Sequence, residues 1–436
     1  MKKWLLSALM LLPSLALAED TPTLDSGDTA WMMMSTALVL LMTPAGLALF
    51  YGGMTRSKNL LNTYAMVLMA FTVAFVAWIA AGYSIAFGTA ESASIQQVSG
   101  GLSHIFLSGI SWNDLSGSYP TYVFVVFQGT FAAITVAIAS GSVIERIKFS
   151  TWLVFVAIWI IVVYAPITHM VWGGDGALLF DAGALDFAGG TVVHMNGGLA
   201  GLVLAILVGK RVGYNKVAMK PMSVMLTALG AALLWFGWYG FNGGSAFGAN
   251  AIAGLAFLTT TLATALAAIT WVLIEWIVYK KPTLLGAASG VVAGLVAITP
   301  AAGFVDVTGA MIMGVVGSGI AFFGVAGLKK MLGYDDSLDA FGIHFLAGLW
   351  GALATAIFAL KDNDLLWDGP LKESGDRMGQ FMVQVESVVV VGLFTLVGTI
   401  VVYYIASALT GGGRVDEDTE AQGLDEAVHG EKGLNL

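Results

Sequence analysis

The sequence predicts an all-α polytopic membrane protein with eleven transmembrane helices. Of its 436 residues, 58% are hydrophobic and 11% are charged, whereas soluble domains average roughly 45–50% apolar and 25% charged residues. Because one membrane helix takes about 20 apolar residues, a chain of this length leaves little mass for a separate extramembrane enzyme domain. The chain has no cysteine, which excludes disulfides, thiol catalysis and cysteine-ligated zinc or iron–sulfur sites.

Residues 1–18 predict a secretory signal peptide. Such a leader has three parts, and all three are present. They are a basic start with two lysines, a short apolar run interrupted by Pro13 and a closing Ala-Leu-Ala. We expect cleavage between Ala18 and Glu19, which would place the mature N-terminus in the periplasm and the protein in a bacterial inner membrane. An uncleaved anchor helix is the alternative.

The eleven spans are expected where long apolar runs occur. These runs cover residues 31–54, 60–87, 121–144, 151–172, 187–209, 222–243, 249–279, 284–302, 307–331, 339–360 and 379–409. With an odd number of spans and a periplasmic N-terminus, the C-terminus lies in the cytoplasm. Twelve Lys and Arg residues fall in the loops expected inside and three in a loop expected outside, which agrees with the positive-inside rule.

The two halves of the chain repeat each other. The first span ends Phe-Tyr-Gly-Gly and the sixth ends Phe-Asn-Gly-Gly, while His194 and His344 are each followed by glycines four and seven residues later. Five helices per copy would invert the second copy relative to the first. We therefore predict inverted repeats over about 31–209 and 222–360, a final helix over 379–409, and a site near the midplane between the halves.

His194 and His344 are candidate pore residues. An ionisable group inside a span is costly and is therefore a functional-site hypothesis. At a rise of about 1.5 Å per residue, the two rings could lie along one central axis, where a pair of neutral imidazoles offers hydrogen bonds to a small polar permeant. The alternative is two structural histidines that bridge helices.

Aromatic residues gather at helix ends predicted to lie outside. Phe127 and Phe131 lie near the start of the third span, Trp172 ends the fourth, and Phe241 with Ser245 ends the sixth. Ring faces and a hydroxyl oxygen can bind a small cation that donates hydrogen bonds, at roughly 0.5–2 kcal/mol per cation–π contact. An interfacial aromatic belt would produce the same placement.

Several of these segments resemble the ammonium transporter family (Amt/MEP/Rh). The segments are Asp186 to Arg211, Phe127-Gln-Gly-Thr-Phe131, residues 50–59 and Asp339-Ala-Phe-Gly-Ile-His344. The likeness extends from about residue 29 into the tail. The presence of Trp172 resembles the bacterial Amt branch of the family rather than the Rh branch. The resemblance implies a transporter domain over residues 19–410, with ammonium as the substrate and a homotrimer with one pore per subunit. It implies no cofactor, no enzymatic activity and no nucleic-acid partner.

The family pattern also implies roles for individual residues. Phe131, Trp172 and Ser245 would form an outer ammonium site, and Phe131 with Phe241 a stacked gate below it. His194 and His344 would line the dry pore.

Asp186 matches the family's acidic residue at the outer vestibule. From its position before a helix, it could instead cap free backbone N–H groups, so a structural role and a proton or substrate role both stay open. Asp339 is expected to be its inverted counterpart, capping the helix of His344.

Solvation energetics predict how ammonium would pass. A bare cation in a low-dielectric lining loses many kcal/mol of hydration, so the substrate should release its proton near the gate and cross as ammonia. Potassium has no proton to release and should be excluded. Whether the proton returns outside or crosses separately is left open by the sequence.

Residues 411–436 form an acidic tail after a glycine hinge, which is typical of a solvated, disordered terminus. However, Gly423-Leu-Asp425 and His429-Gly-Glu431 resemble the tails of family members that bind a PII-type signal protein. A regulatory tail is therefore expected. The alternative function is an ammonium sensor that signals through this segment.

Overall fold

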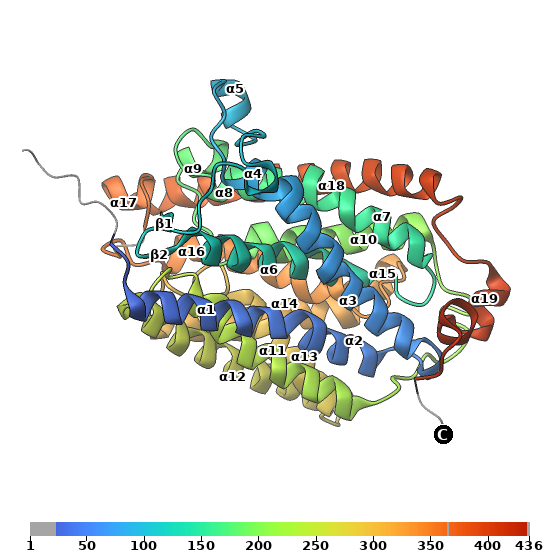
Figure 1. The fold of residues 1–436 in the computed structure, drawn as a ribbon. Coiled ribbons are helices and arrows are strands. Elements are labelled where there is room, and N and C mark those ends of the chain that lie inside the picture. Colours follow the sequence, from blue (N-terminus) through green and yellow to red (C-terminus); the bar gives the residue numbers. More distant parts are fainter. Residues whose placement is uncertain (1–22, 364–365, 434–436) are drawn as a thin grey trace, which may run out of the picture.

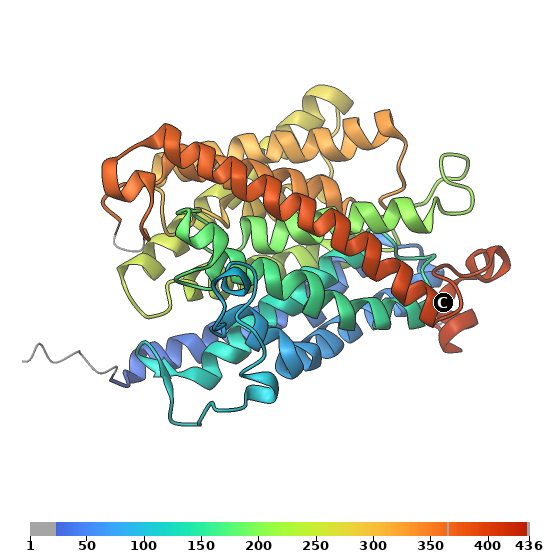
Figure 2. The same ribbon diagram turned by 90° about the horizontal axis from the view of Figure 1, so that it is seen from above.

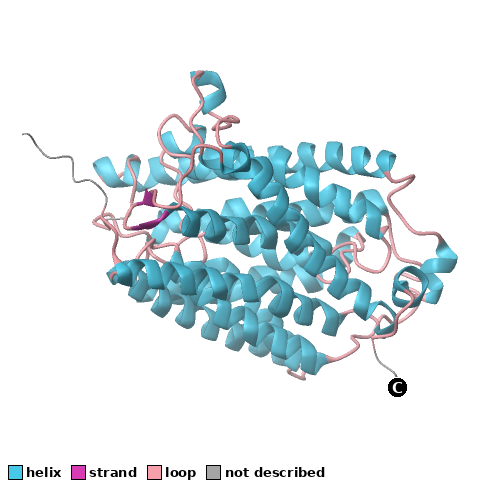
Figure 3. Cartoon of the chain, viewed as in Figure 1, coloured by secondary structure: helices cyan, strands magenta, loops and turns pink. Residues whose placement is uncertain are grey.

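The chain folds into one bundle of long helices (Figure 1). The computed structural model describes residues 23–363 and 366–433, so the predicted signal peptide lies outside the described residues. Helix dominates, and the described part contains one small sheet (Figure 3). Its strands β1 (Leu115–Ser116) and β2 (Tyr119–Pro120) pair antiparallel, with Leu115 opposite Pro120.

The long helices are built from consecutive α-helical and π-helical or 3₁₀ segments. In the first half these are α1 (Ser26–Leu41), η1 (Met42–Leu47) and α2 (Ala48–Met54); η2 (Ser57–Asn59), α3 (Leu60–Ala77), η3 (Trp78–Gly82) and α4 (Tyr83–Phe87); α6 (Thr121–Ser140); α7 (Phe149–Trp159), η5 (Ile160–Tyr164) and α8 (Ala165–Trp172); and η6 (Gly190–Met195) with α10 (Asn196–Val208). In the second half they are α11 (Val224–Gly244); α12 (Ala251–Tyr279); α13 (Leu284–Ile298); α14 (Val307–Phe322), η7 (Phe323–Leu328) and α15 (Lys329–Leu332); η8 (Phe341–Phe345) with α16 (Leu346–Phe358); and α18 (Arg377–Leu409).

Ten of these helices in the described part are long and apolar enough to cross a membrane. The remaining predicted span, residues 284–302, is helical only over the 15 residues of α13. Pro300 accounts for the early end, because proline lacks an N–H and restricts the residue before it. Beyond α13 the chain continues in turns, in which Phe304 N donates to Ala301 O at 2.7 Å.

The ends of the bundle differ. One end, here called the vestibule end, carries the two strands and the short helices α5 (Ala93–Gln96), η4 (Ile105–Leu107), α9 (Leu178–Asp181) and α17 (Pro370–Ser374) (Figure 1). The other, here called the tail end, carries α19 (Glu417–Gln422) and η9 (Asp425–His429). Helix α18 crosses the bundle obliquely from the vestibule end to the tail end (Figure 2).

The helices that carry His194 and His344 pack against each other through matching glycines. A Cβ on Gly198 would lie 2.5 Å from Phe345 N, and one on Gly348 would lie 3.1 Å from His194 Cβ. Each glycine follows its own histidine by four residues and touches the other histidine segment. The repeated spacing in the sequence therefore reflects a close, reciprocal approach of two helices, which only small residues permit.

Residues 411–433 of the tail pack against the bundle and do not form the solvated, disordered terminus that their acidic composition alone would suggest. Leu424 is fully buried, and its N–H donates to Asn59 Oδ1 at 2.8 Å. The Asp425 carboxylate accepts from the N–H groups of Leu61 and Asn62 at the start of α3. The acidic composition alone suggested that this segment is surrounded by water. Instead, Asp425 caps a helix and Leu424 is buried.

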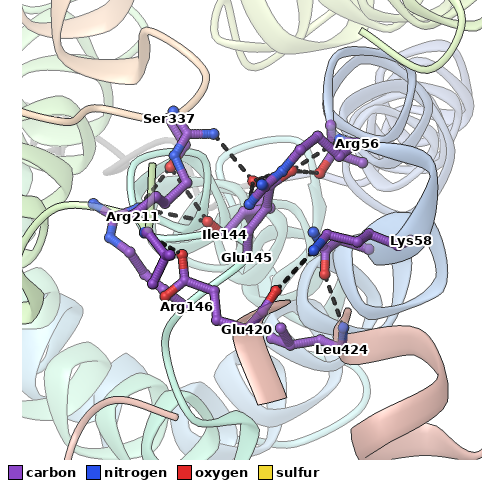
Figure 4. Close-up of polar contacts among 12 residues, drawn as sticks. Arg56, Lys58, Ile144, Glu145, Arg146, Arg211, Ser337, Glu420 and Leu424 are labelled. Carbon is purple, nitrogen blue, oxygen red and sulfur yellow. Dashed lines mark hydrogen bonds and ion pairs between the residues drawn. The ribbon is translucent and has the colours of Figure 1, made fainter. Parts of the chain in front are cut away.

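A buried ion-pair network lies beneath the tail (Figure 4). Glu145 is fully buried and its Oε2 lies 2.6 Å from Arg56 Nη2 and 3.2 Å from Arg211 Nη1. Glu420 of the tail pairs with Arg414 at 2.7 Å and accepts from Val212 N at 2.7 Å. Burial opposes ionisation of Glu145, but Arg211 and Arg56 outweigh it and lower its pKa to about 2.

Candidate functional site

A cavity of about 320 Å³ opens among aromatic side chains near the vestibule end. Four residues singled out in the sequence line it, namely Phe131, Trp172, Asp186 and Ser245. We call it the vestibule cavity. The remaining lining residues, which sequence reasoning did not select, are Phe87, Phe124, Gln128, Phe180, Phe187, Phe247, Phe304 and Trp367.

Two stacked phenylalanines close the inner side of this cavity. Phe131 on α6 and Phe241 on α11 have ring centroids 4.1 Å apart and an interplanar angle of 17°, and both side chains are buried. Trp172 meets Phe131 edge-on, with centroids 6.3 Å apart. The structure therefore brings together the two rings that the family pattern pairs as a gate.

Polar groups fix the remaining walls. The Trp172 indole N–H donates to Asp186 O at 2.8 Å, which sets the orientation of its ring. Ser245 caps the end of α11, and its hydroxyl donates to Phe241 O at 2.9 Å. Because that bond uses the only proton of the hydroxyl, the oxygen presents acceptor lone pairs to a donor in the cavity.

The two histidines lie directly beyond the stacked rings. Their Nδ1 atoms are 3.2 Å apart, and their ring centroids are 5.4 Å apart. The His194 ring centroid is 5.8 Å from that of Phe241. Phe131, Phe241, His194 and His344 therefore form one continuous row that leads inward from the cavity.

His194 has a further hydrogen-bonding position available. His194 Nε2 is buried and has no hydrogen-bond partner in the described part of the chain. Since the Nδ1 contact requires one ring to donate and the other to accept, the free Nε2 of His194 can accept from or donate to a small molecule that comes past Phe241. The direction depends on the tautomer.

Both histidines sit in π-helical segments, η6 and η8. A π segment is a wider turn that recurs at functional sites. Neither the apolar runs nor the glycine spacing indicated these segments. Trp238 was also missed: it lies one turn before Phe241 on α11 and stacks on His194 with centroids 5.3 Å apart. The i to i+3 spacing of Trp238 and Phe241 was the available signal.

Asp186 acts as a cap in this structure. Its carboxylate accepts from the N–H groups of Gly189, Gly190, Thr191 and Val192 at 2.6–3.1 Å and from the Thr191 hydroxyl at 2.6 Å. It is 1% exposed. The side chain thus satisfies the free donors at the start of η6, while its backbone oxygen holds Trp172.

The expectation that Asp339 caps the helix of His344 is wrong. Asp339 instead forms an ion pair with Lys329 at 2.7 Å. Asp336 caps η8, accepting from Ala340 N at 3.2 Å and Phe341 N at 2.8 Å. Asp336 lies in the loop five residues before η8, much as Asp186 lies in the loop four residues before η6. Asp339 is nearer to η8 in sequence, but the loop brings Asp336 to the free N–H groups.

Known proteins resemble this chain over nearly its full length. The model of the Ammonium Transporter Family matches residues 30–434. An ammonium transporter of Aquifex aeolicus is 45% identical over 98% of this chain and 98% of its own, and one of Bacillus subtilis is 44% identical over 94% and 98%.

Solved structures show the same fold. The crystal structure of Saccharomyces cerevisiae Mep2 superposes with a TM-score of 0.81 at 33% identity, covering 91% of each chain. A structure described as a sensor Amt protein gives a TM-score of 0.84 at 27% identity, covering 92% of this chain and 98% of its own. The aromatic cavity, the paired histidines and these full-length matches together show that the chain is a multi-pass membrane protein of the ammonium transporter family.

Proposed function

We propose that this protein carries ammonium-derived nitrogen across the bacterial inner membrane, by binding the cation at an outer site and passing ammonia through a pore. The observation that supports this most is the unbroken row from the vestibule cavity through Phe131 and Phe241 to His194 and His344, with successive ring centroids 4.1, 5.8 and 5.4 Å apart. In this proposal the vestibule end faces the periplasm and the tail end faces the cytoplasm.

The outer site consists of Phe131, Trp172 and Ser245. The ring faces attract a cation, and the Ser245 oxygen accepts one of its hydrogen bonds, since its own proton is engaged with Phe241 O. Ammonium has four donors and suits such a site. Potassium cannot donate a hydrogen bond to Ser245 and has no proton to release, so it stays charged at the gate.

The gate and the histidine pair would act on the neutral form. Phe131 and Phe241 offer no hydrogen bond to compensate for lost hydration, so ammonium releases a proton before passing them. His194 Nε2 then supplies a hydrogen-bonding partner beyond the rings. The cap role of Asp186 leaves its carboxylate fully engaged, and we assign it to holding η6 and Trp172 rather than to substrate.

The decisive experiment measures ammonium uptake and membrane current on the same proteoliposomes. Uptake that is absent from empty liposomes and is reduced, or less selective against potassium, in the His194→Ala and His344→Ala proteins supports the proposal. Current in proportion to uptake means that the proton crosses by a separate route, and uptake without current means that only ammonia crosses. A folded protein with no uptake would contradict the transport proposal.

An ammonium sensor is the second candidate function. It is favoured by the fold similarity to a sensor Amt protein and by the ordered tail. A sensor would show saturable ammonium binding, measured by calorimetry, and uptake no faster than in empty liposomes. The uptake experiment therefore decides between the two functions.

We also propose that the protein is a homotrimer and that its tail end binds a PII-type protein. Residues 411–433 present an outer face that is free for a partner, because Glu417 and Asp418 are exposed while Glu420 and Leu424 are buried. Mass photometry of the purified protein tests the trimer. Truncation of the chain after Leu409 tests the tail.

A further inference from the structure

A third buried histidine, His169, lies in the last turn of α8, one turn before Trp172. Its side chain is fully buried. Its Nδ1 lies 2.9 Å from Ala86 O and its Nε2 lies 2.7 Å from Gln96 O. Backbone carbonyl oxygens only accept hydrogen bonds, so both contacts are hydrogen bonds only when both ring nitrogens carry a proton.

The surroundings of the ring suit a cation that is neutralised by backbone dipoles. No carboxylate oxygen among the described residues lies within 4.0 Å of its nitrogens. The ring instead faces two backbone carbonyl oxygens, one near the end of α4 and one at the end of α5. His169 itself lies in the last turn of α8, where the helix dipole favours positive charge. A neutral ring would point a lone pair at one of these buried oxygens and leave that oxygen without its donor.

One of the two carbonyl groups directly adjoins the lining of the vestibule cavity. Ala86 directly precedes Phe87, which lines the cavity together with Trp172. Gln96 ends α5, and its side-chain amide donates to Asp175 O at 3.0 Å and accepts from Ala90 N at 2.8 Å. The His169 ring is thus the link between the end of α8, the end of α4 and the loop that carries α5.

The fit around this link is tight. A Cβ on Gly173, the residue after Trp172, would lie 2.6 Å from His169 Nδ1. Gly173 N donates to His169 O at 2.8 Å. The turn that presents Trp172 to the cavity is therefore shaped directly around the histidine ring, and a displaced ring would displace Trp172.

We propose that His169 is a positioning residue of the outer cation site, which as a doubly protonated imidazolium holds the Ala86 and Gln96 carbonyl groups and so fixes the relative positions of Phe87 and Trp172 in the lining of the vestibule cavity. This role rests on the proposed function of that cavity. His169 touches no substrate and acts through Trp172 and Phe87.

The protonation state is tested without any transport measurement. The chain has five histidines, and ¹⁵N-histidine-labelled protein in lipid bilayers can be studied by solid-state NMR at neutral pH. We expect one ring with protons on both nitrogens, whose signals disappear in His169→Gln. If that variant does not fold, single substitutions of the other four histidines assign His169 by elimination. A singly protonated His169 would overturn the proposal.

The positioning role is tested by uptake kinetics of two variants. His169→Phe keeps the ring volume and removes both donors, whereas His169→Gln keeps an amide donor without the charge. We expect KM for ammonium to rise about tenfold in His169→Phe, the effect of losing roughly one charged hydrogen bond, with a smaller rise in His169→Gln and a maximal rate within about twofold of the parent.

The control is His104→Gln, at a histidine whose Nδ1 contacts Ser108 O in the loop near the surface, where no change in KM is expected. An unchanged KM in folded His169 variants would refute the positioning role. If the parent protein itself shows no uptake, the proposed transport function fails, while the NMR result still decides the state of His169.

Discussion

Replacement of Asp186 by asparagine separates its two possible roles. The carboxylate accepts five hydrogen bonds from four N–H groups and one hydroxyl. An asparagine side chain has one accepting oxygen, and its NH₂ group would face N–H donors that have no acceptor left. We therefore expect Asp186→Asn to destabilise the protein rather than to alter substrate affinity selectively.

The size of this effect follows from the bonds that are lost. Hydrogen bonds to a charged group contribute about 1.5–3 kcal/mol each and are not additive, and a buried donor left without a partner costs about 1–3 kcal/mol. With the side chain 1% exposed, water cannot replace the missing acceptor. We expect a loss of roughly 3 kcal/mol, at the upper end of single substitutions.

The assay combines thermal unfolding in detergent with ammonium uptake corrected for the amount of folded protein. We expect a lower Tm for Asp186→Asn and, in the fraction that stays folded, a KM changed less than in Trp172→Leu. Asp336→Asn is the matched control, because it removes the corresponding cap of η8 at the other end of the bundle. A variant of unchanged Tm that has lost uptake would refute the cap assignment and favour direct contact with substrate or proton.

Four further predictions concern the pore, the outer site, the tail and the ion-pair network. Replacing His194 or His344 with alanine should reduce uptake or weaken discrimination against potassium, and unchanged transport in both variants would remove the paired-histidine mechanism. Trp172→Leu should raise KM for ammonium while the trimer stays intact by mass photometry; joint loss of folding and uptake would instead indicate a membrane-belt residue. Truncation after Leu409 should keep every spanning helix but abolish co-purification of a PII-type protein from nitrogen-replete cells, whereas equal retention would show that the tail binds no such partner. Glu145→Gln should cost roughly 3 kcal/mol at neutral pH, because Arg56 loses its carboxylate partner and Arg211 keeps only Asp335. Since the pKa of Glu145 is lowered from 4.5 to about 2, its contribution is complete above about pH 4.5 and is lost as pH falls through about 2, so the Tm difference from the parent should close over that range.

Much of the helical architecture could be predicted from the sequence because hydrophobic length is a local property. The apolar runs predicted at 121–144 and 249–279 correspond to Thr121–Ser140 and Ala251–Tyr279. The span at 284–302 was overestimated because hydropathy takes no account of Pro300, which ends the helix while the apolar composition continues. A count of apolar residues predicts which segments are buried in lipid or protein. It does not predict the residue at which the helical backbone hydrogen bonds end.

The site was predictable to the extent that its residues carry distinctive chemistry. A histidine in an apolar run is rare enough to select, whereas Phe131 and Phe241 were selected by the resemblance to the family, and the structure brings all four rings into one row. Contacts that depend on loop geometry could not be read in this way. The choice of Asp336 over Asp339 as a cap, and the ordering of an acidic tail around Leu424, depend on backbone donors whose positions are set only in the folded chain.

The two caps and the two π segments together explain how the histidines come to face each other. Each histidine lies within the first turns of its helix, and each helix begins at a buried carboxylate, Asp186 for η6 and Asp336 for η8. A cap fixes where a helix starts, and a wide π turn adds a residue before the regular α-helix resumes. The carboxylate that caps each helix therefore determines the direction in which the imidazole of that helix points. Because Gly198 and Gly348 let the helices approach closely, a small change at either cap would be transmitted to the 3.2 Å contact between the Nδ1 atoms.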